Sequence, residues 1–186
     1  TGGENLAQAM RPSQSAGVVS YFDSSANSNY HSFQTMLRTV IANRVTLRSS
    51  YTFSAAIDDV SDATGIFPVD ERNLRLDRAR ADYDQPHVFS SSAIYSLPFL
   101  RANRVLGGWQ VSGTVLYRSA LPFSITSNTN NFNGTLNNRI NDMSGTVIRG
   151  AEGSQFLRLA PGVTAASLQP AAGLTGTLGR NTERGD

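Results

Sequence analysis

The sequence lacks several features that would mark common functional classes. Its 186 residues contain no cysteine, which excludes disulfides and thiolate metal sites. No apolar run approaches the length of about eighteen residues that a transmembrane helix needs. The net charge is only +2, and basic residues do not cluster with interleaved aromatics, so the composition gives no support for nucleic-acid binding.

A strict two-residue alternation dominates two stretches, at about 30–41 and about 45–56. This period is typical of β-strands, whose successive side chains point to opposite faces. β-branched and aromatic residues, which favour strands, fill both stretches. On the odd-numbered face the two stretches place Phe33, Thr35, Leu37, Thr39, Ile41, Val45, Leu47, Ser49, Tyr51, Phe53 and Ala55.

The connection between these stretches predicts a tight hairpin. Keeping both apolar faces on one side pairs Ile41 with Val45 across a three-residue turn, Ala42-Asn43-Arg44. Asn43 is well suited to a left-handed backbone conformation there.

The alternation returns at about 87–98 and about 108–125, which predicts two further strands. Two long connections separate the strong strands, at about 57–85 and about 127–174. The first holds eight of the chain's fourteen acidic residues together with four arginines. The second is rich in Asn, Gly, Ser and Thr, and within it Val147–Arg149 and residues 156–159 suggest a minor hairpin.

Charge separates the two faces of the predicted strands. From Phe33 to Tyr117 the odd-numbered face contains no Asp, Glu, Lys or Arg, whereas the even-numbered face contains Arg38, Arg48 and Arg118. A charge on the lipid face of a membrane barrel costs about 2–4 kcal/mol at mid-bilayer, so this pattern suits a transmembrane β-barrel. Short and long connections alternate, as short periplasmic turns and long external loops do. The sequence thus predicts an all-β fold, an antiparallel meander of long strands from a large transmembrane β-barrel with long external loops.

The alternative is a soluble β-sandwich with one buried face, acting as a secreted or surface binding module for a carbohydrate or protein ligand. It explains the alternation equally well. It does not explain the strand length or two long loops at the same end of the strands.

Several tracts resemble, in order and spacing, the C-terminal barrel region of Oar-like TonB-dependent outer-membrane receptors. The resemblance is clear from Asn29 to about Ser127 and looser elsewhere. The tracts are residues 29–34 (NYHSFQ), 50–54 (SYTFS), 57–59 (IDD), 83–89 (YDQPHVF), 95–99 (YSLPF), 107–113 (GGWQVSG) and 179–181 (GRN). The resemblance implies a barrel of about 22 strands in the bacterial outer membrane, with an N-terminal plug, energised through the periplasmic protein TonB.

The sequence differs from that of a complete TonB-dependent receptor. It has four or five convincing strands, and it lacks a plug, a TonB-contacting box and a terminal aromatic strand. We therefore expect a fragment, and an open sheet, because so few strands cannot close a membrane barrel.

The expected partners are outer-membrane lipid, the protein's own plug and remaining strands, TonB through the missing N-terminal part, and an unknown transported ligand. A passive or structural surface barrel is a third possibility. No nucleophile-elbow sequence suggests an enzyme, and no cofactor or metal site is expected.

Two sets of residues are candidates for function. Arg38, Arg48 and Arg118 would face the lumen and either pair with acids of the plug or line the substrate path. Asp58, Asp59 and Asp62, in the first long loop, could meet the ligand or coordinate Ca²⁺ with loop carbonyls. The loop acids could instead pair with the loop's own arginines in a solvated loop. His31 and His87 are expected to be solvated or interfacial rather than metal ligands.

Overall fold

The structure is a computed structural model of the 186-residue chain. It describes residues 23–61, 68–70, 72–98, 107–127, 129, 138–141, 145, 147–149, 157–171 and 173–185.

Two compact units make up the chain. One unit comprises Tyr30–Ala55 and Gln85–Ala120, and contains most of the long strands. The other comprises Thr1–Asn29, Ala56–Asp84 and Leu121–Asp186. We call them the strand unit and the loop unit.

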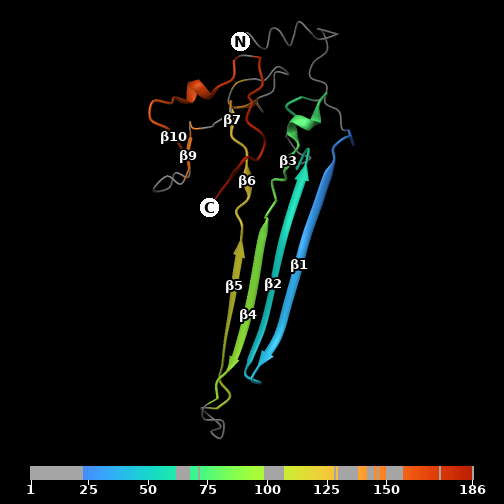
Figure 1. The fold of residues 1–186 in the computed structure, drawn as a ribbon, viewed down its shortest axis with the longest axis vertical. Coiled ribbons are helices and arrows are strands. Elements are labelled where there is room, and N and C mark those ends of the chain that lie inside the picture. Colours follow the sequence, from blue (N-terminus) through green and yellow to red (C-terminus); the bar gives the residue numbers. More distant parts are fainter. Residues whose placement is uncertain are drawn as a thin grey trace. The chain divides into compact units, whose positions relative to one another are not determined.

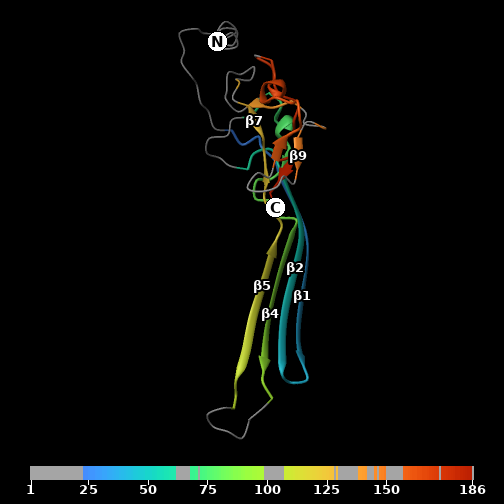
Figure 2. The same cartoon turned by 90° about the vertical axis from the view of Figure 1, so that its left-hand side faces the viewer.

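Four long strands form the sheet of the strand unit. They are β1 (Ser28–Ile41), β2 (Val45–Asp58), β4 (His87–Ser96) and β5 (Gln110–Arg118). Their order in the sheet is β1-β2-β4-β5, and they lie side by side in two views at right angles (Figures 1 and 2). The sheet is open, with β1 and β5 at its edges. The predicted all-β class and antiparallel meander are confirmed.

The strand registers keep the two faces separate. Val45 lies opposite Tyr95, and Tyr95 opposite Val111, so odd-numbered residues face odd-numbered residues across β2, β4 and β5. Directly opposite residues of antiparallel strands share a face. The uncharged face is therefore continuous across these three strands, as the sequence predicts. Its large apolar side chains are exposed: Phe53 by 50%, Val111 by 59% and Tyr117 by 59%.

The turn between β1 and β2 occupies Ala42, Asn43 and Arg44, as predicted. Asn43 has φ +53°, which confirms its left-handed conformation, and Ala42 has φ +50°. The Arg44 N–H donates to the Ile41 carbonyl at 3.0 Å. Two consecutive residues with positive φ therefore lie within the hydrogen bond that closes this three-residue turn.

The fourth strand is shorter than the predicted range 108–125. β5 ends at Arg118, and a separate short strand, β6 (Pro122–Phe123), pairs with β11 (Glu183–Arg184) in the loop unit. Pro122 has no N–H to donate to a ladder. Ser119 also interrupts it, because its hydroxyl accepts from the His87 N–H at 2.8 Å and donates to the His87 carbonyl at 3.0 Å.

The first long connection is not structureless. β2 extends to Asp58, and β3 (Ala79–Arg80) pairs with its last two residues. A single 3₁₀ turn, η1 (Leu74–Asp77), lies just before β3. Acidic side chains that bind backbone groups hold this loop together, as described below.

The rest of the loop unit consists of short elements around a small core. β7 (Thr126–Ser127) pairs with β8 (Asn138–Arg139), and β9 (Val147–Arg149) pairs with β10 (Leu157–Leu159), which confirms the predicted minor hairpin. A second 3₁₀ turn is η2 (Ala165–Leu168). No helix in the described part of the chain is long and apolar enough to cross a membrane. The core residues are Ile140, Leu168 and Leu178, with Ile125 and Val163 packed against them.

Replacing Ala42 by glycine should stabilise the hairpin. A left-handed conformation costs an L-residue about 1–2 kcal/mol, and glycine adopts it freely but loses more entropy on folding. We expect Ala42→Gly to increase the free energy of unfolding by about 0.5–1 kcal/mol, measured by urea titration in detergent micelles. The matched variant Asn43→Ala should be less stable than the parent. A loss of stability in Ala42→Gly would contradict the left-handed conformation of Ala42.

Candidate functional site

Buried arginine–aspartate pairs organise the loop unit. All sixteen basic residues of the chain are arginine, whose planar guanidinium matches the geometry of a carboxylate. Three aspartates from the first long loop, Asp58, Asp77 and Asp84, are buried and pair with arginines 62 to 122 residues away in the sequence. These pairs connect the loop to the C-terminal third of the chain.

Asp58, at the end of β2, pairs with Arg180. The guanidinium of Arg180 contacts the Asp58 carboxylate, and its Nη2 also donates to the Asp58 carbonyl at 3.0 Å. Ser61 Oγ donates to the second carboxylate oxygen at 2.7 Å. Both charged side chains are at least 92% buried. The hydrogen bonds to its remaining atoms offset part of the cost of removing such a pair from water.

Asp77, at the end of η1, pairs with Arg139 of β8. Arg139 Nη1 donates to the Leu76 carbonyl at 2.8 Å, and Asp77 also accepts from the Val69 N–H at 2.9 Å. Burial lowers the pKa of the Arg139 guanidinium, and the neighbouring Asp77 carboxylate acts in the opposite direction. The carboxylate thus positions the loop backbone and balances a buried cation.

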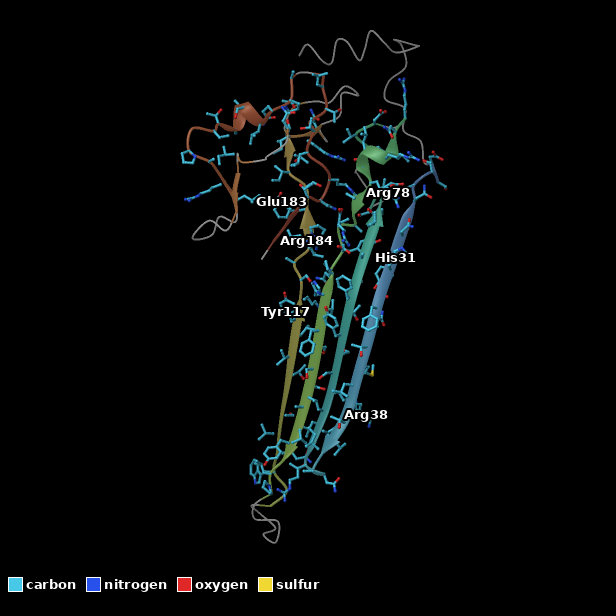
Figure 3. The ribbon with its side chains drawn as sticks, in the orientation of Figure 1. His31, Arg38, Arg78, Tyr117, Glu183 and Arg184 are labelled. Atoms are coloured by element: carbon cyan, nitrogen blue, oxygen red, sulfur yellow. The ribbon has the colours of Figure 1, made fainter. Side chains whose placement is uncertain are left out.

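Asp84 and Asn181 connect the loop to the chain's last strand. Asp84 accepts from the Ala56 N–H at 2.7 Å and pairs with Arg184 at 2.5 Å and with Arg80 at 3.5 Å. Figure 3 shows Arg184 beside Glu183 at the end of the chain. Asn181 has φ +53°, and its amide donates to the Arg80 carbonyl at 2.7 Å.

Asp59 pairs within the loop and with the start of β1. Arg78 Nη1 donates to its carboxylate at 3.1 Å, and Arg78 Nη2 donates to Asn29 Oδ1 at 3.1 Å. The Asn27 N–H donates to the second carboxylate oxygen at 2.9 Å. Figure 3 labels Arg78 in this cluster.

Asp58 and Asp59 therefore have arginine partners, while Asp62 lies outside the described residues. Nowhere in the described ranges do three or more His, Asp or Glu side chains group in a way that could hold a metal ion. The prediction that loop acids pair with the loop's own arginines is correct for Asp59, which pairs with Arg78, and for Asp84, which pairs with Arg80. It does not hold for Asp58 and Asp77, which are buried and paired with arginines beyond the loop.

Arg139, Arg180 and Arg184 are the functional residues that the sequence analysis missed. A charge count gave a usable signal, because the loop contains eight acids and only four arginines. If the loop is buried, the acidic side chains in excess of its own arginines need positive charges from other parts of the chain. Nothing in the sequence indicated which of the other arginines would supply them.

A cavity of about 330 Å³ lies beside these pairs in the loop unit. Arg139, Arg180 and Asn181 line its polar side, and Pro122 and Phe123 of β6 contribute apolar surface. The Nε of Arg180 is buried and has no hydrogen-bond partner.

The even-numbered face of the sheet is polar and positively charged. Where β2, β4 and β5 pair, from Val45 to Phe53 and along both partner strands, this face contains Arg48 and Arg118 and no acidic residue. Both arginines are exposed, as is Arg38 on β1, which is labelled in Figure 3. A hollow of about 290 Å³ surrounds Arg48 on this face.

The histidines belong to the odd-numbered parity. His87, at the start of β4, has its Nδ1 2.8 Å from the Tyr51 hydroxyl, and its ring centroid is 5.2 Å from that of Phe53. His31 and Tyr117 lie along β1 and β5 (Figure 3). An aromatic cluster with polar ring atoms is typical of a membrane–water interface.

Comparison with known proteins decides the class. A family model described as "Outer membrane beta barrel domain" matches residues 2–186. The chain belongs to this outer-membrane β-barrel family. No curated protein and no solved structure matches the chain.

Membership of the barrel family places the protein in the bacterial outer membrane. In a barrel of this family, a face without charges, such as the odd-numbered face, is suited to meet lipid. The even-numbered face would then be directed to the barrel interior, which makes Arg48 and Arg118 candidates for the lumen. The soluble β-sandwich alternative is not supported, because the matching family is that of an outer-membrane barrel.

Val115 and Leu116 provide a matched test of this assignment. They are adjacent in β5, both apolar and similarly exposed, by 61% and 55%, but they point to opposite faces. Val115→Arg should cost about 2–4 kcal/mol in folding free energy in lipid, because it places a charge in hydrocarbon. Leu116→Arg should be tolerated. Equal costs, measured by urea titration in lipid vesicles, would contradict the assignment of the faces.

The Asp58–Arg180 pair is open to a separate test. Arg180→Met leaves a buried carboxylate unpaired, which costs about 3–5 kcal/mol and should reduce amide-exchange protection in residues 56–61 about 100-fold or more. The control is Arg80→Met, because Arg80 is 42% exposed and Asp84 retains Arg184. It should cost no more than about 1 kcal/mol. The double variant Asp58→Leu/Arg180→Met should recover most of the lost protection. Normal protection in Arg180→Met alone would show that the pair contributes nothing.

Proposed function

We propose that the chain forms wall strands and external loops of a TonB-dependent receptor that takes up a ligand across the outer membrane. The observation that supports this is the ordered series of sequence tracts that resemble Oar-like TonB-dependent receptors, from Asn29 to about Ser127, together with residues 179–181. The barrel family supplies the architecture, and the tracts supply the specific kind of barrel.

The positions of those tracts in the structure support the proposal. Asn29 of the first tract contacts Arg78, which pairs with Asp59 of another tract. Arg180, in the last tract, pairs with Asp58. Residues far apart in the sequence that share the resemblance therefore meet in one cluster of ion pairs and hydrogen bonds. If the resembling residues were scattered over unrelated surface positions, they would not contact one another in this way.

In this proposal the ion pairs hold external loops in a defined arrangement. External loops are where a receptor first meets its ligand, and a loop that is ordered beforehand loses less conformational entropy on binding. The partners are outer-membrane lipid, the protein's own plug domain, the remaining barrel strands, TonB and the transported ligand. The protein acts in transport and is not an enzyme.

TonB dependence can be measured on the full-length protein, obtained by sequencing the gene across both ends of these 186 residues. We expect the purified, folded receptor to bind the periplasmic domain of TonB in a calorimetric titration. A variant without the segment that precedes the barrel should fold and not bind. A folded full-length protein that shows no binding would contradict TonB coupling and favour a passive surface barrel.

A further inference from the structure

The lumenal hollow around Arg48 has the composition of an anion site. Cross-strand pairing places Arg48 of β2 opposite Ser92 of β4, and Ser92 opposite Thr114 of β5. Thr46 and Ser112 also line the hollow, so its lining contains four hydroxyl groups and one guanidinium, together with the apolar side chain of Ile94. Ala93 and Gly113 contribute little side-chain volume to it. The result is a recess of about 290 Å³ with many hydrogen-bond donors.

Arg48 has no anionic partner on this face. Within the described part of the chain its guanidinium makes no ion pair, and the paired lengths of β2, β4 and β5 contain no acid on the even-numbered side. The loop unit is different, since each of its buried aspartates Asp58, Asp77 and Asp84 has a paired arginine. An unbalanced cation among hydroxyls attracts anions.

We infer that this hollow binds a carboxylate group. A guanidinium can bind both carboxylate oxygens at once, and the surrounding hydroxyls can donate to the lone pairs that remain. A single positive charge balances a single carboxylate, whereas a phosphate dianion would stay under-compensated. The volume is at the lower limit for ligand pockets, about 300–1,000 Å³, so it suits one anionic group better than a whole large ligand.

Two sources can supply this carboxylate. One is a solute that passes along the lumen, and the other is an Asp or Glu side chain of the same protein that enters the barrel, as in a plug domain. The chemistry at Arg48 is the same in both cases. Only the second source rests on the proposed receptor function, and neither requires TonB binding.

These 186 residues contain no cysteine, so a cysteine substitution introduces the first thiol in this stretch. The test uses the full-length protein in outer membranes, with any cysteine outside these residues replaced by serine. Ser92→Cys places a thiol directly opposite Arg48, at a Cα–Cα separation of about 5 Å. The measurement is the rate at which this thiol reacts with an anionic methanethiosulfonate reagent, divided by the rate with a cationic one of similar size. One positive charge about 6 Å away changes this ratio about tenfold in water.

Adding Arg48→Gln to Ser92→Cys should lower the ratio about tenfold, whereas Arg48→Lys, which keeps the charge, should preserve it. The matched control is Arg118→Gln. Arg118 lies opposite Val88, four residues along β4 from Ser92. That separation of about 13 Å exceeds the Debye length of about 8 Å at physiological salt, so the ratio should not change.

The starting ratio distinguishes the two sources. If the hollow is open to solutes, the Ser92→Cys protein reacts faster with the anionic reagent, and Arg48→Gln brings the ratio to about one. If a side chain of the protein fills it, the starting ratio is about one, and Arg48→Gln leaves an unpaired carboxylate that favours the cationic reagent. If Arg48→Gln does not change the ratio of the two reaction rates, the carboxylate site is wrong. This conclusion does not depend on whether the receptor binds TonB in the calorimetric titration.

Discussion

The structure depends on the separation of charge from one face of a β-sheet. In hydrocarbon an unpaired charge or backbone polar group is costly, so a membrane barrel needs strands whose lipid side is free of charge. Successive residues of a strand alternate between faces, and the odd-numbered residues of β2, β4 and β5 meet this requirement without exception. All charges of the paired sheet therefore fall on the opposite, even-numbered face, where Arg48 and Arg118 lie.

The loop unit solves the opposite problem, because it buries charges. Its four buried aspartates, Asp58, Asp59, Asp77 and Asp84, each bind an arginine. Three of them also accept a backbone N–H: Asn27 donates to Asp59, Val69 to Asp77 and Ala56 to Asp84. A buried carboxylate is tolerated only when its charge and its lone pairs are both satisfied. The hydrophobic core of Ile140, Leu168 and Leu178 is small. Polar contacts therefore account for much of the order in this part of the chain.

These two arrangements suit a receptor in different ways. Ordered loops present a defined surface to a ligand, while a cationic face with no acid along the paired lengths of β2, β4 and β5 attracts an anionic group. In the loop unit, Asp58, Asp77 and Asp84 each neutralise an arginine. In the described part of the sheet, Arg48 has no acidic partner. We attribute this difference to function, since an unbalanced cation adds nothing to the stability of an isolated sheet.

The sequence by itself determined the strands, their faces and the hairpin at Asn43, because these follow from local preferences and a two-residue period. Resemblance and alternation together also indicated the outer-membrane barrel. Only the tertiary structure decided that Arg180 pairs with Asp58 and Arg139 with Asp77, and that Arg48 lies in a hollow lined by hydroxyls. It also decided that the fourth strand ends at Arg118. Partners more than 60 residues apart leave no periodic trace, since many arginines could satisfy each carboxylate and only the folded backbone selects one.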